Sequence, residues 1–148
     1  MGKGIQAERT LSDTVEDEYG YYAQRSAGSG KATQRARADV MAVKTHMVSM
    51  VDHDICRESH TVHLVELKAS PDGTATFDQG EVEQLQEAGE RAGAYVWLAV
   101  KPDMRSHDQW YFIHADEANE TPEGNYSIRK ADHEDALSIR QVFGRGGV

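Results

Sequence analysis

Two charged residues alternate with apolar residues in one short segment of the sequence. Alternate positions of a strand share one face, and within 61–68 that face carries Val62, Leu64, Glu66 and Lys68. A carboxylate and an ammonium group would then stand side by side beyond two apolar neighbours. Charges removed from water are tolerated chiefly when they are paired or bound to a metal. Glu66 and Lys68 therefore form either a structural ion pair or a functional site.

Two more acidic residues occupy positions where a site could form. Asp39 opens an apolar segment directly after a basic stretch that contains glycine and serine. Glu8 falls on the apolar face of the first helically periodic segment. An E-x-K pair by itself is common as a solvated pair of charges on an exposed strand. The combination of Glu66 and Lys68 with Asp39 and Glu8 favours a site instead.

Three carboxylates and one lysine around a phosphate-sized space suit metal-assisted hydrolysis of a phosphodiester. Hard oxygen ligands hold Mg²⁺, and Mn²⁺ accepts the same ligands. A bound Mg²⁺ polarises the phosphoryl oxygen and makes a bound water molecule more acidic. Lys68 can orient that water or neutralise the developing charge. These residue types indicate a Mg²⁺-dependent nuclease.

Hydrophobic periodicity predicts the elements that must position these residues. Helical spacing predicts a first helix over 5–19, and Asp78 with Glu81 at capping-box spacing predicts a second over 78–92. Residues 45–60 lack a clear period, so we expect a long connection or an extended hairpin there. A weaker closing helix is expected over 132–142. Strands are expected at 21–25, 39–43, 61–68, 94–100 and 110–114.

This order of elements predicts an α/β fold in which a central mixed β-sheet is flanked by helices. With 148 residues the chain fits one compact domain over 1–148. No apolar run approaches the roughly 20 residues needed to cross a bilayer, so we expect no membrane partner. Cys56 is the only cysteine, which excludes an intrachain disulfide and favours a reducing, cytoplasmic compartment.

The charge is acidic overall and unevenly distributed. The net charge of −9, from 25 acidic and 16 basic residues, argues by itself against DNA binding. Residues 19–38, however, contain no acidic residue, and one basic side on an acidic body is therefore expected. The lysine-poor, acidic composition favours a halophilic source, and an ordinary acidic cytoplasmic protein is the alternative. The charges within 19–38 are Arg25, Lys31, Arg35 and Arg37.

Six segments resemble, in their order and spacing, the archaeal Holliday-junction resolvases, which are nucleases of the PD-x(n)-(D/E)-x-K type. They cover nearly the whole chain, and each is weak alone while the set is specific. Two correspond to the P-D-I-I-A and I-E-x-K strands of that family, and the last to its T-x-x-G-N-Y turn. The segments are 3–9 (KGIQAER), 25–30, 38–42 (ADVMA), 65–68 (VELK), 79–100 and 121–126 (TPEGNY).

The resemblance implies a restriction-endonuclease-like domain that cuts four-way junction DNA as a homodimer and leaves paired, ligatable nicks. It implies metal binding by Glu8, Asp39 and Glu66, a catalytic role for Lys68, and support of the scissile phosphate by Ser29. Replication or recombination proteins are further candidate partners. Together with the charge pattern, it suggests a halophilic archaeon or its virus as the source. The implied DNA-binding residues are Lys3, Arg9, Arg25, Ser29, Lys31, Arg35 and Arg37.

Two features depart from the family pattern, and one further segment bears on assembly. Ala38 stands where the family has proline before the aspartate, which is tolerable because proline is not a ligand. The stretch between Val43 and Thr61 is longer than expected. The aromatic run from Trp110 to Phe112 is more typical of core or dimer interface than of base stacking, and with neighbouring C-terminal residues it is our candidate interface.

Two further motifs of the sequence suggest other kinds of site. Gly28-Ser29-Gly30-Lys31 is not a P-loop, because Arg25 and Ala32 stand where glycine and serine or threonine are required. The spacing of His53, Cys56, His60 and His63 matches no common zinc site. Another nuclease of the same superfamily acting on duplex DNA, or a non-catalytic junction-binding protein, remain the alternatives. The complete set of acids and lysine argues against the non-catalytic one.

Overall fold

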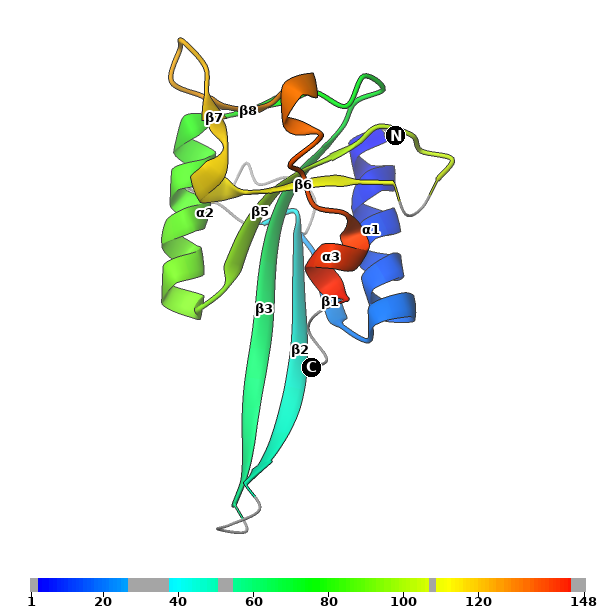
Figure 1. Ribbon diagram of the computed structural model, residues 1–148, viewed down its shortest axis with the longest axis vertical. Coiled ribbons are helices and arrows are strands. Elements are labelled where there is room, and N and C mark those ends of the chain that lie inside the picture. The colour runs from blue at the N-terminus through cyan, green and yellow to red at the C-terminus, as the bar shows by residue number, and fades with distance from the viewer. Residues whose placement is uncertain (1–2, 27–37, 51–54, 107–108, 145–148) are drawn as a thin grey trace.

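A five-stranded mixed sheet lies at the centre of the computed structural model, which describes residues 3–26, 38–50, 55–106 and 109–144 (Figure 1). The strand order is β1-β2-β3-β5-β6, in which β3 and β5 are parallel and the other neighbours are antiparallel. The predicted mixed sheet with flanking helices is confirmed. The strands are β1 Tyr22–Arg25, β2 Val40–Met50, β3 Ile55–Ala69, β5 Tyr95–Lys101 and β6 Tyr111–His114.

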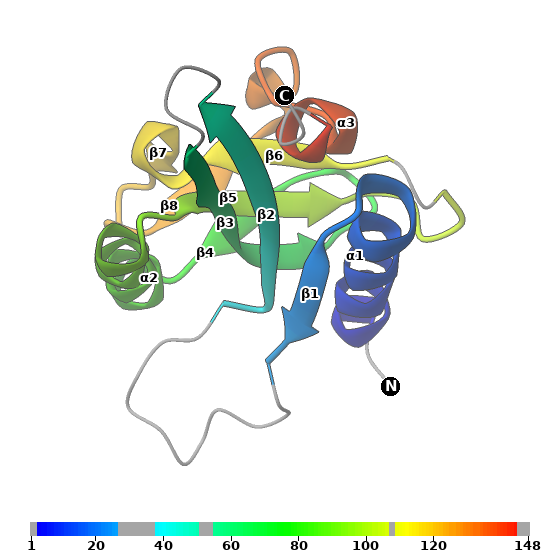
Figure 2. The ribbon, with the colours of Figure 1, turned by 90° about the horizontal axis from the view of Figure 1, so that it is seen from below.

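The two long helices cover opposite faces of this sheet (Figure 2). Helix α1, Lys3–Tyr19, packs Ala7, Leu11 and Val15 into one apolar cluster, which also contains residues of β2, β3 and β6. Helix α2, Gln79–Ala92, packs Val82 and Leu85 into a second cluster on the other side of β3 and β5. Each helix follows the apolar spacing that the sequence predicts.

The limits of α2 follow from local chemistry. Asp78 is the N-cap, and its Oδ2 accepts a hydrogen bond of 3.1 Å from the backbone N–H of Glu81. The helix ends at Gly93, whose φ of 64° is left-handed and therefore favours glycine. The chain then enters β5, where Val96 to Val100 are all buried, as expected of a parallel strand covered on both faces.

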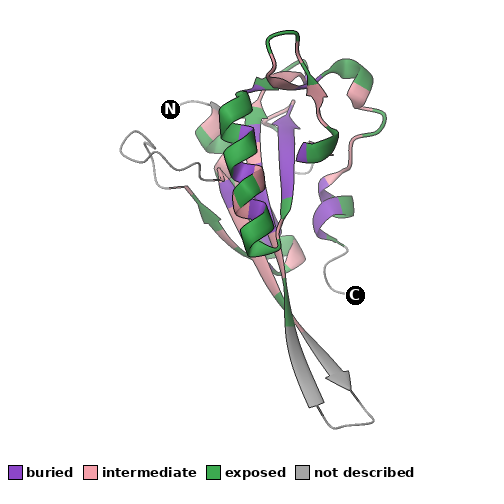
Figure 3. Ribbon diagram, turned by 90° about the vertical axis from the view of Figure 1, so that its left-hand side faces the viewer, coloured by how far each residue is buried: buried purple, intermediate pink, exposed green. Residues whose placement is uncertain are grey.

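Strands β2 and β3 form a hairpin that extends beyond the body of the protein (Figures 1 and 3). Their register runs from Val40 opposite Val65 to Met50 opposite Ile55. Thr45 and His60 are joined by a side-chain hydrogen bond of 3.0 Å near the base of the projecting part. Of the two expectations for 45–60, the extended hairpin is therefore correct, and both strands are longer than predicted.

The C-terminal quarter differs from the expected single helix over 132–142, which is wrong. A 3₁₀ turn, Lys130–Asp132, and helix α3, Ile139–Phe143, are separated by Leu137, which exchanges backbone hydrogen bonds of 2.8 and 2.9 Å with Phe112 of β6. Ser138 then caps α3, accepting a 3.1 Å hydrogen bond from the Gln141 N–H. Pairing with β6 therefore interrupts the helix.

A small second sheet was not expected from the sequence. It contains three short strands in the order β4-β8-β7, and a 3₁₀ turn at Ala115–Glu117 leads into it from β6. It packs near the start of α2, because Phe77 and Ile128 belong to the apolar cluster under that helix. The strands are β4 Ala75–Phe77, β7 Asn119–Glu120 and β8 Tyr126–Ile128.

The aromatic run on β6 belongs to the protein interior. Trp110 is 3% exposed and Phe112 is 0% exposed, and both lie in the cluster under α1 and α3. These two rings therefore do not offer a surface to a second chain, and the candidate dimer interface is wrong for Trp110 and Phe112. None of the helices in the described ranges is long and apolar enough to span a membrane.

Candidate active site

Asp39 and Glu66 meet where β2 begins beside β3. Val40 is paired with Val65, so the next residues outward, Asp39 and Glu66, lie opposite one another. The backbone N–H of Leu67 donates a hydrogen bond of 2.9 Å to Oδ2 of Asp39. The side chains of Asp39 and Glu66 also share a hydrogen bond. Two carboxyl groups from separate strands are thereby held in direct contact.

The electrostatics of this pair are unfavourable for two negative charges. Burial, together with the hydrogen bond and the charge of Asp39, raises the pKa of Glu66 to about 9. The charge of Glu81 acts in the same direction, and the ammonium group of Lys68 opposes it. At neutral pH Glu66 therefore holds a proton unless a cation compensates the second charge. The donor set of hard carboxylate oxygens suits a divalent cation.

Lys68 follows Glu66 on the same face of β3. Leu64 and Val62 on that face belong to the cluster under α2, so this face turns toward α2. The side chain of Glu66 is half-buried and that of Lys68 is exposed, with its Nζ 5.6 Å from the ring centre of Phe77. Lys68 thus presents its charge at the border between the half-buried carboxyl pair and solvent.

Glu8 approaches the pair from α1. Burial raises the pKa of Glu8, the charge of Asp39 raises it further, and the charge of Arg25 at the end of β1 lowers it. Glu8 is therefore a neighbour of Asp39. Within the described residues, however, no three His, Cys, Asp or Glu side chains converge closely enough to hold a metal ion. The structure brings Asp39 and Glu66 together and leaves Glu8 beside them.

Glu81 is a neighbour of the site that the sequence interpretation missed. It lies in the first turn of α2, where its charge is close enough to raise the pKa of Glu66. The sequence showed Glu81 only as the third position after the N-cap Asp78. An acidic residue at the start of the helix that follows the E-x-K strand is the signal that could have identified it.

The remaining predicted residues are only partly described. Lys3 begins α1, Arg9 lies exposed on the same helix, and Arg25 is exposed at the end of β1. Among the histidines considered for zinc, His63 accepts a 2.9 Å hydrogen bond from Trp97 Nε1 and lies 3.3 Å from the Tyr21 hydroxyl. Outside the described residues lie Ser29, Lys31, Arg35, Arg37 and His53.

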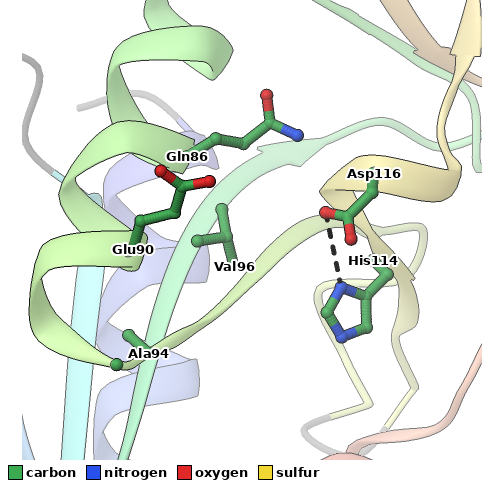
Figure 4. Close-up of a pocket in the computed structure, with 8 residues that line it drawn as sticks. Gln86, Glu90, Ala94, Val96, His114 and Asp116 are labelled. Atoms are coloured by element: carbon green, nitrogen blue, oxygen red, sulfur yellow. Dashed lines mark ion pairs between the residues drawn. The ribbon is translucent and has the colours of Figure 1, made fainter.

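A separate hollow of about 470 Å³ lies at the other end of α2 (Figure 4). Gln86 and Glu90 of α2 face His114 and Asp116 across it, and Oδ1 of Asp116 lies 3.8 Å from Nδ1 of His114. None of the predicted site residues lines this hollow. The carboxyl pair, and not this cavity, is therefore the candidate centre of the chemistry.

Comparisons with known proteins agree with the geometry of the fold. A family model described as archaeal Holliday junction resolvase (Hjc) matches residues 1–147. Among solved structures, Hjc from Archaeoglobus fulgidus, a Holliday junction resolvase from an archaeal hyperthermophile, is similar with a TM-score of 0.71 and 25% sequence identity. That similarity covers 95% of this chain and 99% of the other. A comparison with curated proteins gave no match. The chain belongs to the archaeal Holliday junction resolvase family.

Proposed function

We propose that this nuclease resolves four-way DNA junctions by metal-dependent hydrolysis and that Asp39 and Glu66 hold the metal ion. The observation that carries the proposal is the contact between these two carboxyl groups, with the backbone N–H of Leu67 fixing one of them. A junction resolvase needs to break a phosphodiester. Burying two acids together is costly unless a cation or a proton compensates them, and a cation is useful for that reaction.

Mg²⁺ is the ion that best suits this donor set, with Mn²⁺ as a substitute. Mg²⁺ sites commonly use one or two carboxylates and complete the coordination with water and phosphate oxygens. Asp39 and Glu66 would be the two carboxylates, and Glu8 would contribute as a third acid. When bound, the ion polarises the phosphoryl group and makes a bound water more acidic.

The other residues of the chain act on the DNA and on the attacking water. The ammonium group of Lys68, which is exposed, would orient that water or neutralise charge that develops on the phosphate. Ser29 would support the scissile phosphate or its neighbour. Phosphate contacts position DNA without reading its sequence, so junction shape would decide the substrate. The proposed phosphate-binding residues are Lys3, Arg9, Arg25, Lys31, Arg35 and Arg37.

A homodimer is the assembly that fits this activity. Resolution requires two cuts placed symmetrically across the junction, and one chain carries one Asp39–Glu66 pair. A two-fold dimer supplies two such pairs with matching symmetry. The interface must use surface other than Trp110 and Phe112, since both are buried within one chain. Sedimentation at micromolar concentration should give twice the mass of one chain, and a monomer would contradict the dimer.

The decisive experiment compares a synthetic four-way junction with a linear duplex of matched sequence in the presence of Mg²⁺. Wild-type protein should cut the junction into two nicked duplexes, while the Asp39→Asn variant should bind the junction without cutting it. Equal cutting of both DNAs would favour a general duplex nuclease. Selective binding without any cutting, in Mg²⁺ or Mn²⁺, would favour a non-catalytic junction-binding protein.

A further inference from the structure

Strand β1 carries an aromatic side chain that the core does not use. Tyr21, directly before β1, is 3% exposed and packs in the cluster under α1, whereas Tyr22 points to the opposite face of the sheet and is 62% exposed. Ile5 and Tyr95, the other exposed large hydrophobic residues of the described ranges, are less exposed, at 43% and 51%. Because β1 is an edge strand, this exposed ring is accessible to a partner.

The position of Tyr22 relates it to the carboxyl pair. Tyr22 is paired with Val43 of β2, and Val43, Met41 and Asp39 alternate along the same face of that strand. Met41 packs against the cluster under α2, which shows that this is the α2 face of the sheet. Val43 lies four positions after Asp39, which is roughly 13 Å along a strand.

The face around Tyr22 is exposed and free of acidic residues on its own strand. Helix α2 packs against β3 and β5, whereas β1 forms the edge of the sheet and lies apart from that helix in Figure 2. The neighbouring position on the same face of β1, Gln24, is also exposed. Arg25 follows, and the whole segment 19–38 lacks aspartate and glutamate. In a chain of net charge −9, a strand without acidic residues repels a polyanion less than the acidic segments around it do.

We propose that the Tyr22 ring stacks against a base pair or base exposed at the branch point of the junction and so contributes to selection of branched over linear DNA. The inference rests on the proposed junction-cutting function. At about 3.4 Å of rise per nucleotide, 13 Å corresponds to roughly four nucleotides from the phosphate held near Asp39. Ring stacking is independent of sequence, because every base has a π-face.

The geometry of branched DNA explains why such a ring would select for it. In a linear duplex both faces of each internal base pair are covered by neighbouring pairs, so a protein ring cannot stack there without opening the helix. At a branch point the stacking is interrupted, and a face becomes available. Tyr22 would therefore add binding energy to the junction complex and none to the duplex complex, which is the requirement for specificity.

The test uses the full-length protein and the pair Tyr22→Leu and Tyr95→Leu. Both changes keep an apolar side chain and remove an exposed ring, but Tyr95 begins β5 on the α1 face, away from Asp39. Affinities for junction and matched duplex are measured in EDTA, where no cutting occurs. A junction with 2-aminopurine at the branch point reports stacking directly.

We expect Tyr22→Leu to weaken junction binding about tenfold, to leave duplex binding unchanged and to abolish the 2-aminopurine response. Tyr22→Trp should keep both, because the ring and not the hydroxyl is required. Tyr95→Leu should behave as wild type. Unchanged junction affinity and an unchanged fluorescence response in Tyr22→Leu would overturn the inference, as would equal losses on junction and duplex.

A separate measurement distinguishes this inference from the proposed function. Cleavage by the wild-type protein with Mg²⁺ is followed on the same junction. Ring-dependent junction binding without cleavage overturns the hydrolytic function and supports the role of Tyr22. Cleavage of the junction with full selectivity in Tyr22→Leu supports the function and overturns the role of the ring. A wild-type protein that binds junction and duplex equally overturns both.

Discussion

The backbone N–H of Leu67 donates a hydrogen bond of 2.9 Å to Oδ2 of Asp39. Leu67 lies between Glu66 and Lys68 on β3, and its own side chain is buried on the α1 face. The bond therefore attaches Asp39 to the strand that carries Glu66 and Lys68. The position of Asp39 relative to both depends on rigid backbone and not on a flexible side chain, as preorganised sites require.

Glu66→Gln should abolish cleavage and leave the fold intact. Burial and Asp39 raise the pKa of Glu66 to about 9, so the carboxyl group is protonated near neutral pH without metal, and glutamine closely resembles that form. The amide cannot supply a negative ligand, so we expect a rate loss of about 100-fold or more. Single-turnover junction cleavage and the unfolding temperature are measured, with Glu83→Gln on the exposed surface of α2 as control.

Asp39→Asn should also abolish cleavage, for a similar reason. The asparagine amide keeps an oxygen that can accept the Leu67 N–H but loses the charge that holds a cation. Junction affinity in EDTA should stay within about twofold of wild type, because the change removes no lysine or arginine side chain that binds phosphate. Wild-type cleavage rates in this variant would remove Asp39 from the metal site.

Lys68→Ala should lose cleavage while still binding metal. Lys68 acts on water or on developing charge, so its removal should lower the cleavage rate by roughly 100-fold. Removal of a nearby ammonium group does not take away any carboxylate ligand, and Mn²⁺ affinity measured by calorimetry should therefore be unchanged or slightly higher. Loss of Mn²⁺ binding in this variant would contradict the role assigned to the lysine.

His63 should make folding stability sensitive to acid. Burial, and then the charge of His114, lower the pKa of His63 from 6.5 to about 4, and it is enclosed by Tyr21, Tyr95 and Trp97 as well. The unfolded chain takes up a proton near pH 6.5, whereas the folded chain does so only near pH 4. The stability is thus complete above the higher value and is lost as pH falls toward the lower one.

The size of this acid effect can be measured against a variant without the imidazole. From pH 7 to pH 5 the unfolding free energy should fall by about 2 kcal/mol more in wild type than in His63→Gln. Glutamine can still accept the Trp97 N–H through its amide oxygen. Urea unfolding at both pH values is the measurement. If the unfolding free energy of the two proteins falls equally between pH 7 and pH 5, His63 does not cause the effect.

Gly89→Ala should destabilise the protein even though alanine favours helices. A Cβ at Gly89 would overlap Cγ2 of Val96 on β5, so α2 and β5 could not keep their close approach. We expect a net loss of about 1–3 kcal/mol. Val96→Ala should recover part of that loss in the double variant. Gly4→Ala is the control, because a Cβ there has no neighbour within 4 Å among the described atoms, and it should stabilise by up to about 1 kcal/mol.

Salt should stabilise the folded chain. The net charge of −9 implies mutual repulsion among surface carboxylates, and ions screen that repulsion. The urea midpoint should therefore rise between about 0.1 M and about 1 M KCl. The comparison uses KCl because chloride and potassium have little effect of their own on apolar burial. A midpoint that falls, or precipitation with loss of nuclease activity at high salt, would contradict the halophilic interpretation.

The local features of this protein could be predicted from its sequence because their causes are local. Alternation predicted that Glu66 and Lys68 share a face of one strand, and the structure places them so. The Asp78 cap and the apolar spacing predicted the limits of α2 closely. Each of these depends on residues at most four positions apart, where steric and hydrogen-bonding preferences decide the backbone.

Tertiary structure alone decided which of these features meet. The contact between Asp39 and Leu67 joins residues 28 positions apart, and it exists because β2 pairs with β3 in one register out of several. The crossover between β3 and β5 brings Glu81 near Glu66, and pairing of Leu137 with Phe112 breaks the predicted C-terminal helix. Burial likewise assigned Trp110 to the core. Composition and periodicity describe single segments, and these outcomes depend on the energy of packing one segment against another.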